Sequence, residues 1–493
     1  MSVNNNSKVD KTQVNLLDMP NKKYKNALHI FRRDYRIVDN TALNIASKCA
    51  SDGVIPIFIF TYRQIKANPL KSNNCVQFLV ESLEDLRHQI TESGGKLYIY
   101  YTTDEYKLIK QILLKNPGIG VVSWNRDYTK YSEDRDAKIK EMCLALDRDV
   151  ITPDDHLLHP LGTIVTGTKS QPHPYTKYTP FMRATLSKPI AKPDLHYKPK
   201  FVKLQKSPAE YGGKLSAFHD NIVNINLPEK GGRKNGLNIL NNLREWKTYD
   251  KNRDQLIYKT THLSPFNKFG CISVREAYWR MRDSLGVNCG LIRQLAWRDF
   301  FYNLSATHTY IYTSGAMNKK WENIGWSEPG KNLDIWIKGK TGFPIVDAAM
   351  REIAETGYMH NRARLISANF LTRLLSIDWR RGERYFAAQL YDYDPAQNSF
   401  GWQLNAAVSG TESRPLNQTI LNPWIPSVKY DHDAQYIKKW LPELSEIPPG
   451  HLHRWDKYGG LYVDKIKTYP CVPIINYDKA KQENLKIYKQ VKY

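Results

Sequence analysis

The hydrophobic pattern changes its period about halfway along the chain, and this change limits the folds that the chain can adopt. Between residues 26 and 146, short β-rich runs at 27–31, 54–60, 96–101 and 121–124 alternate with helical stretches at 75–93 and 105–114. Buried strands that alternate with helices form βαβ units with a parallel sheet. From about Leu237 onward the strand runs disappear and apolar residues recur at helical spacing. The pattern predicts a doubly wound α/β domain followed by an all-α domain.

The same patterns divide the chain into five segments. We expect a disordered tail over 1–25, the α/β domain over 26–150, a connector rich in Pro, Gly and Lys over 151–236, and the helical domain over 237–464. Residues 465–493 hold seven Lys against two acidic residues, and we expect a flexible basic tail there. The clearest helix lies at 343–356, where Ile345, Ala349 and Ile353 recur four apart and Gly357 stands at the position that ends a helix.

The chain carries 72 Lys and Arg against 49 Asp and Glu, a formal net charge of +23 over 493 residues. A surplus of this size indicates a polyanionic partner such as nucleic acid, although a general Lys-rich bias gives the same count. The longest apolar run, 54–60, is too short to cross a membrane, and residues 1–17 lack the apolar core of a secretory signal. We therefore expect a protein that neither spans a membrane nor is secreted.

Several common sites are not supported by their motifs. The six cysteines form no C-x-x-C pair, which argues against structural zinc or a disulfide scaffold and favours a reducing compartment. Residues 339–341 end like a phosphate-binding loop, but Asp334 stands where that loop needs glycine. His451 and His453 lack further ligands at suitable spacing, so we predict no metal site.

Ionisable and aromatic residues concentrate between 249 and 402, in segments with a buried helical pattern. Asn361 and Arg364 share one face of a predicted helix. A buried arginine needs a partner, and Asp392-Tyr393-Asp394 is the nearest carboxylate cluster in sequence. This pattern fits an ion pair that only pins two helices as well as it fits a binding site. Likewise, the hydroxyls at 260–264 either cap a helix or bind a phosphate.

Six long segments, in the same order, resemble the DNA photolyase/cryptochrome family. They are FRRDYRIVDNTAL (31–43), TTHLSPFNKFGCIS (260–273), RQLAWRDFFYNL (293–304), 340–386 with its GYMHNRARLISANF, DYDPAQNSFGW (392–402) and KYDHDAQYIKKWLPEL (429–444). The resemblance covers about residues 26–458 and is greatest to class I cyclobutane pyrimidine dimer photolyases. It implies an N-terminal α/β domain, a long linker and a C-terminal helical domain that holds FAD in a U shape.

The resemblance implies a set of residues that hold FAD. The diphosphate would be bound by Tyr249, Thr260, Thr261, His262, Leu263 and Ser264, and the flavin would be surrounded by Gln294, Arg298, Asn361, Arg364, Asp392, Tyr393, Asp394 and Asn398. Asp392 would pair with Arg364, and Asp394 would accept a hydrogen bond from the isoalloxazine ring. Asn398 would face the flavin N5, and because photoreceptor members often have another residue there, this position favours repair over signalling.

Three tryptophans match the electron relay of the family. In that relay, indoles leading outward from the flavin are oxidised in turn and so re-reduce it in light. The matching residues are Trp402, Trp379 and Trp326. Each alone would be read as core packing, but together with the FAD motifs the relay is the better interpretation.

The implied partner is UV-damaged DNA, bound by a monomer that works wherever the cell keeps its DNA, in the nucleus or the cytoplasm. Trp297 would stack on the flipped pyrimidines, since such enzymes take the lesion out of the stack. Gln294 and Asn361 would hydrogen-bond the lesion. Arg253 and Arg362 would meet backbone phosphates, to which the net charge adds a salt-dependent attraction.

Departures from the family pattern bear on the lesion. Gln294 occurs in enzymes that act on (6-4) photoproducts, whereas Asn361 occurs in dimer enzymes and (6-4) enzymes need a histidine there. Leu365 is neither the Met of many dimer enzymes nor the second His of (6-4) enzymes. Leu404 replaces the second aromatic of the usual W-Q-W, and the loop 408–423 also differs. Because (6-4) chemistry without either histidine is hard to support, we predict a cyclobutane dimer photolyase that uses reduced FAD.

Three alternatives stay open: a cryptochrome-type blue-light photoreceptor, a (6-4) photolyase, and a DNA-binding protein that has lost photochemistry. About 35 residues follow the part that resembles the family. We expect these residues to be too few to form the long signalling tail that many cryptochromes have. The resemblance does not decide whether the α/β domain also holds an antenna chromophore, a folate or a deazaflavin.

Overall fold

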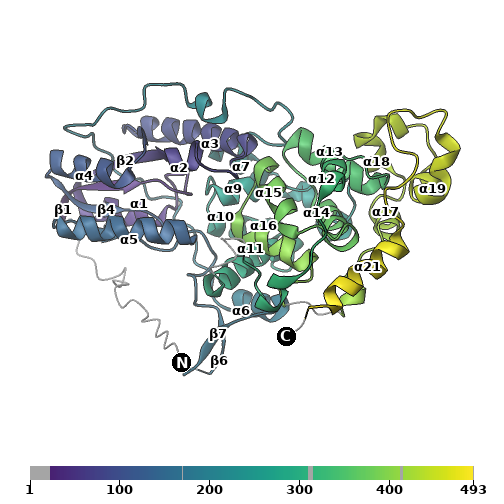
Figure 1. The fold of residues 1–493 in the computed structure, drawn as a ribbon. Helices are drawn as coiled ribbons and strands as arrows, with labels where there is room; N and C mark the ends of the chain where they lie inside the picture. The colour runs from purple at the N-terminus through teal and green to yellow at the C-terminus, as the bar shows by residue number, and fades with distance from the viewer. Residues whose placement is uncertain (1–22, 169, 309–314, 411–414, 492–493) are drawn as a thin grey trace.

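A five-stranded parallel sheet of order β3-β2-β1-β4-β5 forms the N-terminal part of the computed structural model, which describes residues 23–168, 170–308, 315–410 and 415–491 (Figure 1). The strands are β1 Tyr24–Ile30, β2 Ala50–Thr61, β3 Tyr98–Thr102, β4 Ile119–Ser123 and β5 Asp149–Ile151. The helices between them are α1 Thr41–Cys49, α2 Tyr62–Ile65, α3 Asn73–Glu92, α4 Glu105–Lys115 and α5 Lys130–Ala145. The strand order reverses between β1 and β4, as in doubly wound sheets.

Both faces of this sheet are buried, because successive residues of a strand point to opposite sides. Ala27 packs with residues of α1 and α3 in one apolar cluster, while its neighbour Leu28 packs with residues of α4 and α5 in another. The predicted α/β domain is therefore confirmed. Residues 24 and 25 belong to β1 rather than to the predicted tail, and residue 151 belongs to β5 rather than to the connector. Residues 1–22 of the predicted tail lie outside the described residues.

The connector between the domains is partly ordered. It contains the antiparallel pair β6 Val165–Gly167 and β7 Pro172–Pro174, then α6 Tyr178–Ser187, η1 Leu215–His219 and α7 Arg233–Asn241. Figure 1 shows β6 and β7 projecting from the molecule beside α6. Helix α6 packs on α11 of the helical domain, whereas η1 packs on α3 of the α/β domain. The connector therefore contacts both domains.

Beyond α7, the described residues form helices and no strand, as the sequence predicts. These are η2 Leu243–Trp246, α8 Tyr249–Asn252, α9 Ser264–Lys268, α10 Val274–Leu285, α11 Gly290–Thr307, η4 Lys319–Asn323, α12 Gly330–Ile337, α13 Pro344–Thr356, α14 Asn361–Asn369, η5 Phe370–Leu374, α15 Trp379–Gln389, α16 Pro395–Asn405, η6 Leu416–Gln418, α17 Trp424–Tyr430, α18 Gln435–Trp440, η7 Pro442–Leu444, α19 Pro449–Leu452, α20 Trp455–Tyr458, η8 Gly459–Tyr462 and α21 Tyr477–Lys489. Helix α13 has the predicted limits: Pro344 fits its first turn, and Gly357 ends it at a φ of +63°.

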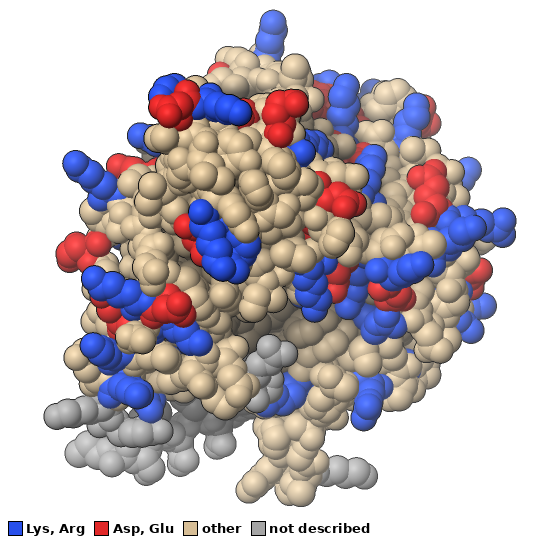
Figure 2. All heavy atoms as spheres, turned by 90° about the vertical axis from the view of Figure 1, so that its right-hand side faces the viewer, with Lys and Arg blue, Asp and Glu red and all other residues tan. Residues whose placement is uncertain are grey.

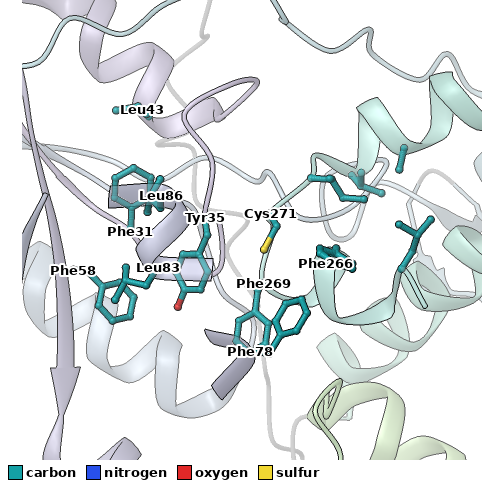
Figure 3. Packing of buried hydrophobic residues seen from close by; sticks show 14 of the residues in the cluster. Phe31, Tyr35, Leu43, Phe58, Phe78, Leu83, Leu86, Phe266, Phe269 and Cys271 are labelled. Carbon is teal, nitrogen blue, oxygen red and sulfur yellow. The ribbon is translucent and has the colours of Figure 1, made fainter. Parts of the chain in front are cut away.

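The two domains share one hydrophobic core. Figure 3 shows Tyr35 and Phe78 of the α/β domain pointing toward Phe266 and Phe269, which belong to the helical domain. The ring of Phe269 is stacked at 5.8 Å on Tyr35 and at 5.6 Å on Phe78, measured between ring centroids. The relative placement of the domains is therefore set by packed aromatic side chains.

The prediction of a flexible basic tail is wrong for residues 477–489, which form helix α21. Ala480, Asn484 and Tyr488 recur four apart and are buried, while most of the lysines lie on the other faces. The amide Nδ2 of Asn484 donates to the Thr372 carbonyl at 3.2 Å and to Ser376 Oγ at 2.9 Å. Only three residues of α21 are buried, and the four lysines of the helix made the segment resemble an exposed tail in the sequence.

Replacing the buried Asn484 with alanine tests whether α21 is docked. Asn484→Ala leaves the Thr372 carbonyl and the Ser376 hydroxyl without their donor, which we expect to lower the free energy of unfolding by about 1–3 kcal/mol. Chemical denaturation measures this change, and Gln482→Ala, at an exposed position of the same helix, is the matched control. Equal stability of the two variants would contradict the docked helix.

Candidate functional site

An ion pair joins the start of α14 to the loop before α16. Arg364 Nη2 donates to both oxygens of Asp392, at 3.1 and 3.0 Å, and Ser264 Oγ donates to Asp392 Oδ2 at 2.7 Å. Burial opposes the charge on Arg364, but the neighbouring Asp392 outweighs it and raises the pKa of the guanidinium. The structure thus brings together Arg364, Asp392 and Ser264, three residues that the resemblance assigns to FAD.

Asp394 lies two residues further on, and its carboxylate is buried among donors. It accepts from Arg33 Nη2 at 2.7 Å, from the hydroxyl of Tyr302, and from Gln397 N at 3.2 Å, where it caps α16. Burial alone would raise the pKa of Asp394, but Arg33 and these hydrogen bonds hold it below its usual value. Arg33 follows β1, and the sequence analysis did not pair it with Asp394. Its only signal was its place in the FRRDYR segment.

Asn398 is oriented by Glu383 of α15. Its Nδ2 donates to the Glu383 backbone carbonyl at 3.2 Å and to Glu383 Oε1 at 3.0 Å, and the Tyr393 hydroxyl donates to the same Oε1 at 3.4 Å. Burial raises the pKa of Glu383. Because the amide nitrogen of Asn398 is held by Glu383, its Oδ1 is turned toward other partners and can accept a hydrogen bond. A flavin N5–H is a donor of that kind.

The segment 260–264 leads into the short helix α9, whose first residue is Ser264. Thr260 Oγ1 lies 3.1 Å from the Tyr358 hydroxyl, and His262 has a left-handed backbone with a φ of +50°. The Nδ1 atom of His262 is buried, lies 3.6 Å from Glu229 Oε1 and has no hydrogen-bond partner in the described part of the chain. No side chain caps the start of α9, where Leu263 precedes Ser264. Thr261 is buried beside these residues, while Tyr249 begins α8.

The buried side chain of Arg298, on α11, shows whether the site has a group that would bind a polar cofactor. The side chain is buried, its Nη1 is 3.4 Å from Asp299 Oδ1, and its Nε has no hydrogen-bond partner among the described residues. A buried N–H without an acceptor is costly, and an acceptor atom of a bound flavin would remove that cost. Burial also raises the pKa of Asp299 to about 7, although the nearby Arg298 opposes that rise. The residues present therefore fit an anionic ring.

The residues predicted to meet the lesion lie on α11 and at the start of α14. Gln294 and Trp297 are three residues apart on one face of α11, and Asn361 is the exposed first residue of α14. Trp297 is stacked on Tyr178 of α6, with ring centroids 3.6 Å apart and planes 6° apart. Leu404 packs in the same apolar cluster. Tyr178 was missed in the sequence because it lies in the connector.

The two arginines predicted to meet phosphates share one carboxylate. Arg362 Nε donates to Asp254 Oδ1 at 2.9 Å, and Arg253 Nε lies 4.0 Å from the same oxygen. The guanidinium of Arg362 also lies over the ring of Tyr430, at 5.3 Å. A DNA phosphate would therefore have to compete with Asp254 for these side chains.

The three predicted relay tryptophans become more exposed along the proposed order. Trp402 and Trp379 are buried, whereas Trp326 is partly exposed and lies 6.1 Å from the ring of Tyr488. The indole of Trp402 lies against Gly382 of α15, where a Cβ atom would overlap it. The need for glycine in the IDWRRGE segment is thus explained by the close approach of an indole.

Comparison with known proteins identifies the family. Residues 27–199 match the DNA photolyase family, and residues 291–490 match the FAD binding domain of DNA photolyase. The deoxyribodipyrimidine photo-lyases of Buchnera aphidicola and of a Synechococcus strain are each 31% identical to this chain, over 94% of it and 96% of their own length. The chain belongs to the DNA photolyase/cryptochrome family.

Solved photolyase structures share the whole fold of this member. A photolyase from Sulfolobus tokodaii with two FAD molecules is 32% identical, with a TM-score of 0.80 over 94% of this chain and all of its own. A class III photolyase from Agrobacterium tumefaciens is 28% identical, with a TM-score of 0.83 over 96% of this chain and 99% of its own. A Synechocystis cryptochrome, at 23% identity and a TM-score of 0.84 over 94% of this chain and all of its own, shows the fold alone.

Two absences concern the part of the chain that the structure describes. No helix there combines the length and apolar character needed to cross a membrane. Nor do its His, Cys, Asp and Glu side chains form a group of three or more that could hold a metal ion.

Substituting Gly382 tests the contact with Trp402. Gly382→Ala places a methyl group where the Trp402 indole now lies, so the indole has to move. We expect the free energy of unfolding to fall by about 1–3 kcal/mol and the photoreduction of oxidised flavin to become slower. The loss of oxidised-flavin absorbance during continuous blue illumination measures the rate of photoreduction. Gly401→Ala, at a helical glycine whose Cβ would meet open space, is the control. If Gly382→Ala photoreduces its flavin as fast as the parent protein, the contact between Gly382 and Trp402 does not affect electron transfer through the relay.

Proposed function

We propose that this protein is a light-driven DNA repair enzyme that splits cyclobutane pyrimidine dimers. The observation that carries the proposal is the match, over nearly the whole chain, to relatives that are deoxyribodipyrimidine photo-lyases. The orientation of Asn398 supports it, because its Oδ1 is turned away from Glu383 and can accept from the flavin N5–H, as in repair members. Site geometry and relatedness therefore favour repair over signalling.

The cofactor of the proposed reaction is reduced FAD. When bound, it supplies a light-driven electron that opens the dimer and then returns, so the reaction has no net redox change. Arg298 would offer a buried positive charge and a free Nε–H to the anionic ring. Ser264, Arg364 and Asp392 would fix the loops around it through their hydrogen bonds. The chain thus orients the flavin, keeps water out and balances its charge.

The proposed DNA contacts combine general attraction with a few specific side chains. On the face seen in Figure 2, Lys and Arg side chains are scattered among Asp and Glu and form no single basic block. The net charge of +23 therefore acts as a diffuse attraction on that side. Recognition of the lesion would rest on Trp297, Gln294 and Asn361, with Arg253 and Arg362 reaching phosphates once these displace Asp254.

A second candidate is a (6-4) photolyase, which Gln294 favours. Illumination of the prereduced protein with two oligonucleotides, one with a cyclobutane thymine dimer and one with a (6-4) photoproduct, decides between them. We expect restored thymines, quantified by chromatography, only from the dimer, because Asn361 and Leu365 replace the histidines that (6-4) chemistry needs. Repair of the (6-4) product alone would reverse the assignment. Bound flavin without repair of either lesion would support a photoreceptor.

Side chains of the described residues fill most of the space at the switch point of the sheet. Ligands of doubly wound sheets bind at the carboxyl ends of the strands where the order reverses, here β1 and β4. Arg33 lies there, 3.3 Å from Asp127 Oδ1 and 3.2 Å from His156 Nε2, and the remaining cavity of about 10 Å³ holds about one water molecule. We therefore propose that no antenna chromophore occupies this position.

The absorbance of the purified protein tests this proposal. We expect substitution of Asp127 or His156 to leave the absorbance spectrum, and the FAD content per chain after acid release and chromatography, unchanged. A stoichiometric folate, deazaflavin or second FAD, lost on substitution of Asp127 or His156 but not of residues on α14, would show that the side chains open to admit one.

A further inference from the structure

Tyr178 of the connector is fixed on α11 at two points. Its ring is stacked on the indole of Trp297 with centroids 3.6 Å apart, and its hydroxyl donates to the backbone carbonyl of Arg293 at 2.8 Å. Arg293 and Trp297 are four residues apart, so the tyrosine spans one turn of the helix. Burial raises the pKa of Tyr178 to about 12, so the hydroxyl keeps the proton that it donates.

The indole of Trp297 is held from several sides but not enclosed. Phe300 meets it edge-on at 5.8 Å and Phe301 lies tilted at 5.6 Å, while Tyr178 covers one of its faces in parallel. The side chain of Trp297 is nevertheless partly exposed. A lesion approaching from solvent would therefore meet an indole whose orientation is already fixed.

We propose that Tyr178 is a positioning residue for lesion binding: it holds the partly exposed Trp297 indole in one orientation, ready to stack on a flipped pyrimidine. This inference rests on the proposed function. Fixing a side chain before binding removes part of the ordering cost of association. Leu404 adds an aliphatic wall in the same cluster, so the aromatic surface for the lesion depends on Trp297 and on what holds it.

The test compares binding of flavin-loaded protein to a dimer-containing oligonucleotide and to its undamaged counterpart in the dark. Stacking of one base on an aromatic side chain strengthens binding by roughly five- to 150-fold. We therefore expect Tyr178→Leu to weaken binding of the damaged strand roughly ten-fold and to change binding of the undamaged strand by less than about two-fold. In a Trp297→Leu background, Tyr178→Leu should have no further effect, because the tyrosine acts through the indole. Tyr175→Leu, which removes another aromatic of the same cluster, is the control.

The possible results separate the inference from the function on which it rests. Equal weakening of both oligonucleotides, additive effects in the double variant, or tighter binding by Tyr178→Leu would overturn the positioning role while leaving repair intact. A parent protein that does not discriminate the two strands would refute the proposed function itself and the inference with it. Should Tyr178→Leu fail to fold, Tyr178→Phe, which loses only the bond to Arg293, should still show a two- to three-fold selective loss of damaged-strand binding; no loss would again overturn the proposal.

Discussion

The buried contact between Arg33 and Asp394 connects the two halves of this protein at the point where its chemistry is expected. Arg33 follows β1 in the α/β domain, whereas Asp394 caps α16, the helix that carries Asn398 and Trp402. Removing Arg33 would leave the buried carboxylate of Asp394 without its cation, which costs several kcal/mol. The orientation of α16, and with it the placement of the proposed flavin contact, therefore depends on the N-terminal domain. The helical domain alone would lack this support.

The shared aromatic core extends the same constraint over the domain interface. Tyr35 and Phe78 pack on Phe269, and close by Arg275 binds Asp39 at 3.0 Å and Asp155 at 2.8 Å. An interface built from stacked rings and buried ion pairs resembles the interior of a single domain more than a sliding contact. We infer that the domains keep a fixed relation while the protein works, so light-driven chemistry needs no domain closure.

The sequence predicted those features that depend on residues close together in the chain. Alternating β-rich runs predicted the sheet, and apolar spacing with Gly357 predicted α13 and its end. It failed where pairing is distant: Arg33 and Asp394 are 361 positions apart, and Arg362 and Asp254 are 108 apart. Helix α21 was missed for another reason, because lysines outnumber the buried residues on it and net charge says nothing about which face is buried. Within the site, the resemblance implied the pair of Arg364 with Asp392, 28 positions apart, but not the pair of Arg33 with Asp394.

The proposed lesion site is asymmetric, and this asymmetry follows from two residues far apart in the chain. Leu404 stands where the resemblance implies an aromatic residue, which removes a stacking surface, whereas Tyr178 of the same cluster stacks on the indole of Trp297. Stacking alone accepts any pyrimidine, because every base has a π face. Choice among lesions must then come from polar groups that can tell one ring system from another, here Gln294 and Asn361. The aromatic pair would supply affinity and the two amides specificity, so the same scaffold could change its lesion by substitution at the amide positions without rebuilding its core.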